Sequence, residues 1–278
     1  MRGLIVTADD FGLSEAVNEA VERAHRDGIL TTASLMVAGP AAEDAVRRAK
    51  AMPSLAVGLH LVVIEGPAML RQTIAPAGQF PSGQFRLGVN YFFRSAFRRQ
   101  LAAEIRAQFE AFATTGLPLD HANAHKHMHL HPTVGRLMID IGREFGLRAV
   151  RVPAEPAGGG IGHRVLHAWT RLLRHQARRA GLAVNDHCFG ISWTGAMTAD
   201  RLVQLAGSLP DGVSEAYFHP AAWREERLAA LMPNYAHEAE LVALLDPAVR
   251  KALAAHDVRL LPGFGELTSC LARPPIAQ

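Results

Sequence analysis

The sequence predicts an α/β fold, namely a TIM-like (β/α) barrel of seven or eight strands that forms a single domain. Three observations predict it. The chain has 278 residues, of which 49% are hydrophobic, and barrels of about 250 residues routinely form one unit. Short apolar runs alternate with amphipathic stretches. No GxGxxG motif follows the first run to favour an open dinucleotide-binding sheet.

The apolar runs predict the strands, and the stretches between them predict the helices. Strands are expected at residues 3–8, 32–37, 56–60, 119–124, 148–152, 183–188, 214–218 and 257–261. Helices are expected at 14–28, 41–51, 97–115, 132–145, 163–180, 198–208 and 236–254. In the first helix, Ser14 is a suitable N-cap and Gly28 is expected to end the helix in a left-handed turn.

Two connections are longer than is usual in a compact barrel. Residues 64–96 contain many Gly and Pro and show little periodicity, and residues 153–162 are looser still. Long loops of this kind are often lids or binding loops. We therefore expect residues 1–278 to form one domain with a lid-like insertion at about 64–96.

The composition points to a cytoplasmic protein. Met1 and Arg2 lead into a short apolar stretch that already reaches Asp9, without the longer run of a signal peptide. No apolar run approaches the roughly 20 residues of a membrane span. Two cysteines, Cys188 and Cys270, are too few for a disulfide framework.

Basic residues are clustered although the net charge is only +3. One cluster follows the "YFF" at 91–93, and a second lies along one predicted helix; the residues are Arg94, Arg98 and Arg99, and Arg164, Arg171, Arg174, Arg178 and Arg179. These clusters fit contact with phosphate or with the inner face of an anionic membrane, and they also fit ordinary solvated helix faces. Without interleaved exposed aromatics they do not indicate nucleic-acid binding. Monomeric and oligomeric states are both compatible with the sequence.

Polar residues follow most of the predicted strands at their carboxyl ends. They are Asp9, Asp10, His60, His125, Arg151, Asp186 and His219. In a (β/α) barrel these strand ends converge on one mouth, where active sites lie. We therefore expect these side chains to meet in space although they are scattered along the sequence.

The stretch "HANAHKHMHLHP" at 121–132 holds five of the fourteen histidines. In an extended chain the odd positions share a face, so His121, Asn123 and His125 can point into the barrel before the chain turns away. Neutral imidazoles with one carboxylate form a three-ligand set that leaves a position open for water, as in catalytic zinc sites.

Such a set would explain the adjacent carboxylates of Asp9 and Asp10. A divalent cation bound by one aspartate would neutralise their repulsion, and the other could accept a proton from water at the metal. The alternative is that one of them caps the helix that begins near Ser14.

Five motifs together resemble a known family. They are "TADDFG" at 7–12, "GLHL" at 58–61, "NAHKHMHLHP" at 123–132, "RVP" at 151–153 and "YFHP" at 217–220. In order and spacing they resemble the YdjC-like carbohydrate deacetylases, and most of all the branch associated with hopanoid biosynthesis. The resemblance implies a metal-dependent hydrolase that removes acetyl from an N-acetylglucosamine-type sugar, here the headgroup of a hopanoid lipid.

The resemblance also implies roles for individual residues. Asp10, His60 and His125 correspond to the metal ligands, and Asp9 to the general base. Arg151 would orient or pair with Asp9, and His219 would protonate the leaving amine.

Two further histidines correspond to supporting positions, His127 and His129. His129 is the alternative ligand in place of His125 or His60, because related polysaccharide deacetylases use two histidines four residues apart.

The chain departs from the general family at one position, where Asp-Ser-His is replaced by Asn123-Ala124-His125. Losing this carboxylate weakens a hydrogen-bond acceptor for a ligand histidine, although the amide still offers its carbonyl. Two histidines and one carboxylate favour zinc or another transition ion over magnesium, and the resemblance implies magnesium as the second candidate.

Other functions fit the same residues. The enzyme could deacetylate a soluble N-acetylated oligosaccharide, or run an isomerase, aldolase or phosphoesterase reaction on the same barrel. A non-catalytic carbohydrate- or lipid-binding relative is a further alternative. The aromatics of "VNYFFRSAF" at 89–97 could contact lipid, or Phe92, Phe93 and Phe97 could anchor the loop to the following helix.

Overall fold

Nine parallel strands form one sheet in the described part of the chain, which comprises residues 2–156 and 161–267 of a computed structural model, with backbone only for 161–165. Cys270, the side chain of Arg164 and part of the 153–162 connection lie outside the described residues. The strands are β1 (Arg2–Phe11), β2 (Thr32–Leu35), β3 (Ala56–Leu61), β4 (Leu119–Ala124), β5 (Ala149–Val150), β6 (Ala183–Val184), β7 (His187–Phe189), β8 (Gly212–Phe218) and β9 (Val258–Leu260).

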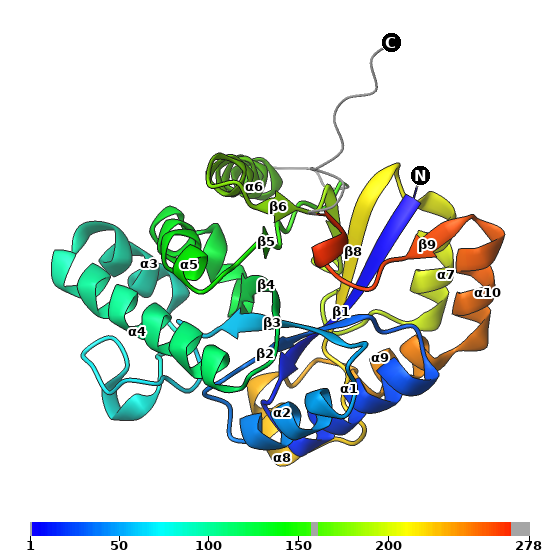
Figure 1. Ribbon diagram of the computed structural model, residues 1–278, viewed down its shortest axis with the longest axis horizontal. Helices are drawn as coiled ribbons and strands as arrows, with labels where there is room; N and C mark the ends of the chain where they lie inside the picture. Colours follow the sequence, from blue (N-terminus) through cyan, green and yellow to red (C-terminus); the bar gives the residue numbers. More distant parts are fainter. Residues whose placement is uncertain (1, 157–160, 268–278) are drawn as a thin grey trace, which may run out of the picture.

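The sheet curls into a barrel-like shape (Figure 1). Its order is β6, β5, β4, β3, β2, β1, β8 and β7, with β9 paired to β1. The edge strands β6 and β7 are consecutive in the chain, with only Asn185 and Asp186 between them. One continuous segment of the chain therefore supplies both edges of the curled sheet, which confirms the predicted fold class. The strand expected at 183–188 is in fact two strands, β6 and β7.

Strand β1 occupies the centre of this sheet. It pairs with β8 along one side, while on the other side β9 pairs with Arg2–Leu4 and β2 pairs from Thr7 onward. Every residue from Gly3 to Phe11 is buried. Asp9 and Asp10 therefore emerge at the end of the most enclosed strand.

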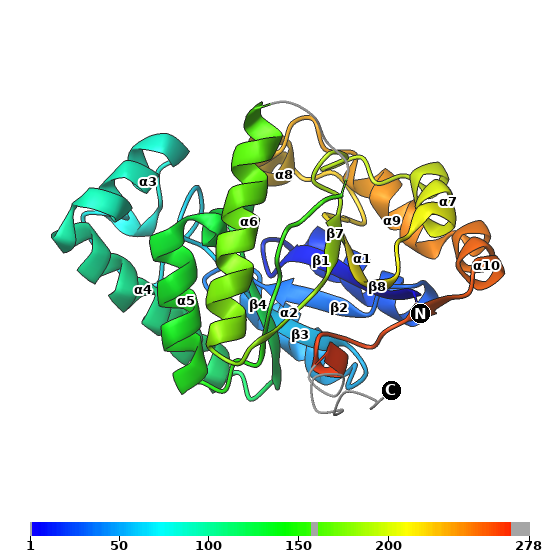
Figure 2. The same ribbon diagram turned by 90° about the horizontal axis from the view of Figure 1, so that it is seen from above.

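Helices cover the outside of the sheet. They are α1 (Glu15–Asp27), α2 (Ala42–Lys50), α3 (Gln84–Phe93), α4 (Ser95–Thr114), α5 (Pro132–Glu144), α6 (Ile161–Arg179), α7 (Ala199–Ser208), α8 (Glu226–Leu231), α9 (His237–Leu245) and α10 (Pro247–Ala255), with short 3₁₀ helices η1 (Pro76–Gly78) and η2 (His125–Leu130). Figure 2 shows α5 and α6 on one side of the strands and α7, α9 and α10 on the other. In the described residues, no helix is both long and apolar enough to span a membrane.

Of the two ends expected for α1, the Ser14 N-cap is confirmed and the left-handed turn at Gly28 is not. Ser14 accepts a hydrogen bond from the N–H of Val17 at 3.3 Å and caps the helix. Gly28 does not adopt the left-handed conformation, since its φ is −116°. Its need for glycine is steric instead, because a Cβ there would lie 2.4 Å from the carbonyl oxygen of Leu244.

The 64–96 insertion is not devoid of periodic structure, because it contains helix α3. Only Leu87 and Tyr91 of this helix are buried, while Phe85 and Phe93 are largely exposed. Apolar residues thus lie on more than one face of α3, which hides the helical period in the sequence. The buried Tyr91 hydroxyl ties α3 to the barrel by donating to the carbonyl of Val63 at 2.9 Å.

The helix expected at 236–254 is two helices, α9 and α10. Pro247 is the first residue of α10, and Asp246 caps it by accepting from the N–H of Ala248 at 2.8 Å. Proline lacks the N–H that would continue α9, so the chain turns at this point. Helix α8 also lies in a region for which no helix is expected from the sequence.

Candidate active site

The structure brings together six of the seven polar residues that follow the predicted strands. Asp9 and Asp10 end β1, His60 lies in β3, and His125 begins η2 directly after β4. Arg151 follows β5 and His219 follows β8.

Asp186 does not join this group, so its expected place at the mouth is wrong. Its carboxylate accepts from the N–H of Val213 at 2.9 Å, near the start of β8 and therefore at the opposite end of the barrel. The chain reaches Asp186 between β6 and β7 rather than at the end of a continuous strand, which the sequence pattern does not reveal.

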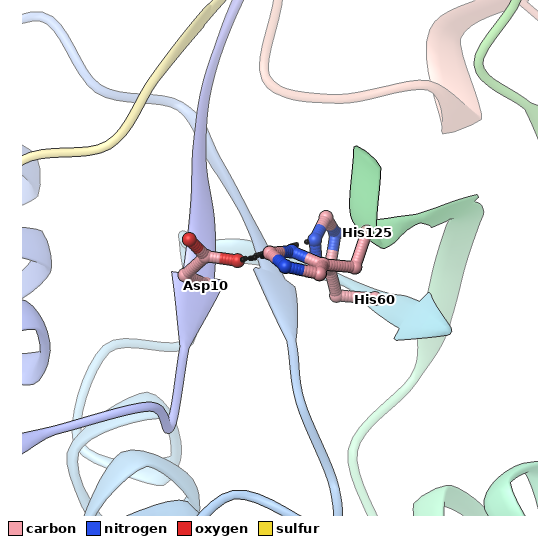
Figure 3. A group of neighbouring side chains, drawn as sticks. All are labelled: Asp10, His60 and His125. Atoms are coloured by element: carbon pink, nitrogen blue, oxygen red, sulfur yellow. Dashed lines mark ion pairs between the residues drawn. The ribbon is translucent and has the colours of Figure 1, made fainter. Parts of the chain in front are cut away.

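Asp10, His60 and His125 form a group of potential metal ligands. Oδ1 of Asp10 lies 3.3 Å from Nε2 of His60 and 3.2 Å from Nδ1 of His125. One ligand atom from each residue lies within 4.8 Å of the others. Figure 3 shows the carboxylate and both imidazole rings pointing toward one another.

The backbone at Asp10 allows both aspartates to reach this site. Successive residues of an extended strand point to opposite faces. Asp10 instead has a φ of 62°, in the left-handed region, and the pairing of β1 with β2 shifts register between Ala8 and Phe11. Both carboxylates then approach His60, with Oδ1 of Asp9 lying 3.8 Å from its Nδ1. Such a conformation is costly for a non-glycine residue and is typical of functional sites.

Each aspartate has its own positive or hydrogen-bonding neighbours. Arg151 donates to both carboxylate oxygens of Asp9, at 2.5 and 3.0 Å. Burial raises the pKa of Asp9, but the charge and hydrogen bonds of Arg151 outweigh it and hold that pKa well below its usual range. Burial raises the pKa of Asp10 as well, but the charges and hydrogen bonds of His125 and His60 outweigh burial and hold that pKa well below its usual value. Both aspartates are therefore ionised, and neither caps α1.

Glu215 is a charged residue of the site that our sequence analysis missed. It lies in β8, fully buried, and its carboxylate accepts from Nε and Nη2 of Arg151 at 2.6 to 2.9 Å. The hydroxyl of Thr7 donates to the same carboxylate at 2.7 Å. Arg151 is thus fully buried between two carboxylates. The signal was a lone glutamate inside the apolar strand pattern at 214–218.

Asn123 connects the two halves of the site. Its amide nitrogen donates to Oδ1 of Asp9 at 3.2 Å, and its carbonyl oxygen lies 2.7 Å from Nδ1 of His60. The amide therefore supplies the acceptor that was expected to remain at this position. A second carboxylate here would instead face that of Asp9.

His127 and His129 have partners that direct them away from Asp10. Nε2 of His129 is 3.1 Å from the carbonyl oxygen of Arg151, and Nε2 of His127 is 3.1 Å from the hydroxyl of Tyr217. Burial lowers the pKa of His127 to about 3 and that of His129 well below its usual value. Both are neutral at pH 7, and His129 is not part of the ligand group described above.

His219 is held at the mouth by Glu240, a second residue that our sequence analysis missed. Oε2 of Glu240 accepts from the N–H of His219 at 2.5 Å, and its Oε1 accepts from the N–H of Met197 at 3.0 Å. Burial raises the pKa of Glu240 to about 7 and lowers that of His219 to about 4. Because Glu240 lies in α9, far along the chain, only the tertiary structure reveals its role.

A small cavity opens beside these residues. Its volume is about 130 Å³, and its lining includes Asp9, His60, His125, His127, Tyr217 and His219. A larger groove of about 720 Å³ shares Lys126 and His127 with it and continues along α3 and α6. A third hollow of about 550 Å³ shares His125, Lys126 and Met232 with the cavity. The polar cavity is thus the meeting point of two grooves.

The sequence matches known proteins along nearly its whole length. The model of the YdjC-like protein family matches residues 3–255. A carbohydrate deacetylase of Brevibacillus brevis is 31% identical over 271 residues, which cover 95% of this chain and 99% of that protein. A carbohydrate deacetylase of Geobacillus stearothermophilus is 31% identical over 266 residues, which cover 94% and 96%.

Solved structures share the fold at lower sequence identity. A protein of Enterococcus faecalis named for cellobiose-phosphate cleavage has a TM-score of 0.75 and 22% identity, with coverage of 98% of this chain and 99% of that one. A lactam utilization protein from Thermus thermophilus has a TM-score of 0.50 and 18% identity, with coverage of 94% and 99%. These likenesses concern the fold alone, whereas the sequence matches show that the chain belongs to the YdjC-like protein family.

Proposed function

We propose that the protein is a metal-dependent hydrolase that removes the acetyl group from an N-acetylglucosamine-type sugar. The observation that carries the proposal is the group of Asp10, His60 and His125 beside a buried, ionised Asp9. The carbohydrate deacetylases that match the chain support the substrate class.

The donor set fits a divalent ion. Both carboxylate oxygens of Asp10 and Nε2 of His60 are buried and have no hydrogen-bond partner among the described residues. Buried polar atoms are rarely left in this state, and a cation held by Asp10, His60 and His125 would satisfy them. When bound, the ion would supply Lewis acidity toward the amide carbonyl and toward water. Two imidazoles and one carboxylate favour zinc or another transition-metal ion over magnesium.

Asp9 is the proposed general base. Its ion pair with Arg151 keeps it deprotonated, and so able to accept a proton from the attacking water. Arg151 and Asn123 hold both carboxylate oxygens in place, which directs the base without requiring it to move. Glu215 balances the second half of the Arg151 guanidinium.

His219 is the proposed proton donor to the leaving nitrogen. It lines the cavity, and its buried Nδ1 has no hydrogen-bond partner in the described part of the chain. Because burial lowers its pKa to about 4, His219 is neutral at pH 7. It would therefore deliver a proton gained during the reaction, and the products would be acetate and a free amine.

We further propose that the sugar is the headgroup of a hopanoid lipid. The groove beside the cavity is lined mainly by apolar and aromatic side chains, among them Phe85, Val89, Phe92, Phe93 and Trp169. Such a groove suits an apolar aglycone whose sugar end enters the polar cavity. Peripheral contact with a membrane surface is part of this proposal, because the lipid would have to be reached there.

An acetate-release assay tests the proposal. We expect release from an N-acetylglucosaminyl hopanoid in the presence of Zn²⁺, and loss of release after treatment with EDTA that added Zn²⁺ restores. Release only from soluble N-acetylglucosamine oligosaccharides would contradict the lipid substrate and favour the soluble one. Binding of either compound without acetate release would contradict the hydrolase itself.

A further inference from the structure

A row of polar side chains crosses the barrel interior beneath the candidate site. It runs from Asp120 through His121, Ser34 and Asn123 to His60. Ser34, His121 and Asn123 are completely buried, and the Asp120 side chain is 11% exposed. Barrel interiors are ordinarily filled by branched apolar side chains. A buried polar row in that place therefore calls for a physical reason.

The hydrogen bonds at the upper end of the row fix one arrangement of protons. The amide nitrogen of Asn123 donates to Oγ of Ser34 at 2.9 Å and to Asp9 at 3.2 Å. Its carbonyl oxygen must then accept from Nδ1 of His60, at 2.7 Å. With the proton on Nδ1, the neutral His60 ring carries its lone pair on Nε2, which lies 3.3 Å from Oδ1 of Asp10.

His121 fixes the direction of the bonds at the lower end. Nδ1 of His121 faces Oδ2 of Asp120, a carboxylate that can only accept, so Nε2 of the neutral ring is the acceptor for the hydroxyl hydrogen of Ser34, at 3.0 Å. The proton of His121 is therefore on Nδ1, which faces Oδ2 of Asp120 at 3.0 Å. Each donor in the row faces an acceptor. Reversing the hydrogen-bond direction at a single member would make a donor face a donor, or an acceptor face an acceptor, at its neighbour.

The barrel floor is shaped around the His121 ring. Phe264 stacks on it with a centroid distance of 4.4 Å, and a Cβ on Gly58 would lie 2.5 Å from it. Asp120 also accepts the N–H groups of Phe264 and Gly265, at 3.0 and 2.9 Å. Burial raises the pKa of Asp120, but these bonds and that of His121 lower it below its usual value. Asp120 is thus a permanent acceptor.

We infer that His121 is a positioning residue that fixes which nitrogen His60 offers to a metal ion. It acts through Ser34 and Asn123. Without the acceptor of His121, the Ser34 hydroxyl is free to turn, and only Asp9 then holds the NH₂ group of Asn123 in its present orientation. A flipped amide would present its NH₂ group to Nδ1 of His60 and favour the tautomer with the proton on Nε2. In that tautomer Nε2 has no lone pair to offer a metal ion. The inference rests on the metal site of the proposed function.

Zinc affinity of the purified full-length protein tests the inference, measured by competition with a chromophoric chelator. His121→Leu removes the acceptor at similar volume, whereas His121→Gln retains one for Ser34. We expect His121→Leu to raise the dissociation constant for Zn²⁺ by about 10-fold, the lower end of the cost of losing a direct partner of a ligand, because His121 acts through two intervening residues. His121→Gln should stay near the wild-type value.

Two further variants keep the test decisive. Ser34→Ala breaks the row without altering the aromatic stack, and should weaken Zn²⁺ binding as His121→Leu does, even if His121→Leu does not fold. Phe264→Leu removes the stack but keeps the backbone N–H to Asp120, so it should lower the melting temperature and leave zinc affinity unchanged.

The outcomes separate this inference from the proposed function. Equal zinc affinity in the Leu and Gln variants, or an unchanged affinity in Ser34→Ala, would overturn the positioning role. An equal loss of affinity in Phe264→Leu would also overturn it, because general loosening of the barrel would then explain the effect. Absence of zinc binding by the wild-type protein would overturn the metal site of the proposed function as well.

Discussion

The two sides of the candidate site are built in opposite ways. On the strand side, Asp9, Arg151 and Glu215 are buried, and Arg151 donates hydrogen bonds to both carboxylates. On the α3 side, the side chains of Phe85 and Phe93 are 87% and 77% exposed. Fixed, buried charges suit chemistry because they need no reorganisation when a reaction occurs. Exposed apolar side chains suit recognition because they gain burial only when a ligand arrives.

The largest effect is expected from removing a proposed metal ligand on the strand side. His60→Ala and His125→Ala should each remove a metal-binding nitrogen, so metal content should fall and acetate release should drop by several orders of magnitude. Metal analysis of the purified variants and an acetate assay measure both effects. His127→Ala is the matched control, since its ring contacts Tyr217 rather than Asp10, and it should do less. If His125→Ala keeps its metal and its rate, the ligand assignment is wrong.

The next effect separates the two aspartates. Asp9→Asn keeps the size of the side chain but cannot accept a proton, so the metal should remain while turnover falls by roughly 10² to 10⁴, as for loss of a general base. Asp10→Asn should instead weaken metal binding. Single-turnover rates and metal content of both variants distinguish the roles. Equal loss of metal in the two variants would show that no such division exists.

Much of this strand side could be predicted from the sequence. Short apolar runs ending in polar residues are a local pattern, and a parallel barrel brings such ends together whatever the loops do. This pattern predicts that Asp10, His60 and His125 lie at one site, as they do in the structure. It failed for Asp186, because the strand there is broken into β6 and β7 and the residue turns to the other end of the barrel.

The residues that support the site could not be predicted in the same way. Glu215 and Glu240 are each identified by a partner far away in the chain, namely Arg151 and the backbone of His219. A single sequence carries no sign of such pairs. Helix α3 was missed for a different reason, because its exposed phenylalanines are placed for contacts outside the core and obscure its amphipathic period.

A third prediction concerns the ionisation of Glu240, whose carboxyl group is buried beside His219. Its pKa of about 7 in the folded protein lies above the ordinary 4.5, so the folded state binds the proton more tightly than the unfolded state. Stability from this group is complete below pH 4.5 and is lost as the pH rises through about 7. The loss should be on the order of 3 kcal/mol.

Urea unfolding of the metal-free protein at pH 5.5 and pH 8 measures about 2 kcal/mol of this loss, because the rest has already occurred at pH 5.5. Glu240→Gln should remove most of the difference in unfolding free energy between the two pH values, because glutamine carries no proton to lose. Glu238→Gln, an exposed neighbour on α9, should leave the difference unchanged. A difference that persists in Glu240→Gln would assign the pH dependence to other groups on the strand side.

The smallest expected effect tests the α3 side. Phe92 and Phe93 line the apolar groove and are 43% and 77% exposed, so they contribute little to the core. Burying a large aromatic is worth roughly 1.5 to 3 kcal/mol, which corresponds to about a ten- to hundredfold change in affinity for each substrate contact. The double variant Phe92→Ala with Phe93→Ala should therefore raise KM for an N-acetylglucosaminyl lipid by at least about tenfold while sparing a short soluble glycoside.

The melting temperature decides whether this side is a recognition surface. It should hardly change in the double variant, and Val242→Ala, which removes an exposed apolar side chain on α9, should alter neither KM value. Parallel losses on the lipid and the soluble glycoside, or a sharply lowered melting temperature, would mean that the two phenylalanines anchor α3. The contrast between a rigid chemical side and an exposed recognition side would then fail at α3, and the substrate would be an ordinary soluble sugar.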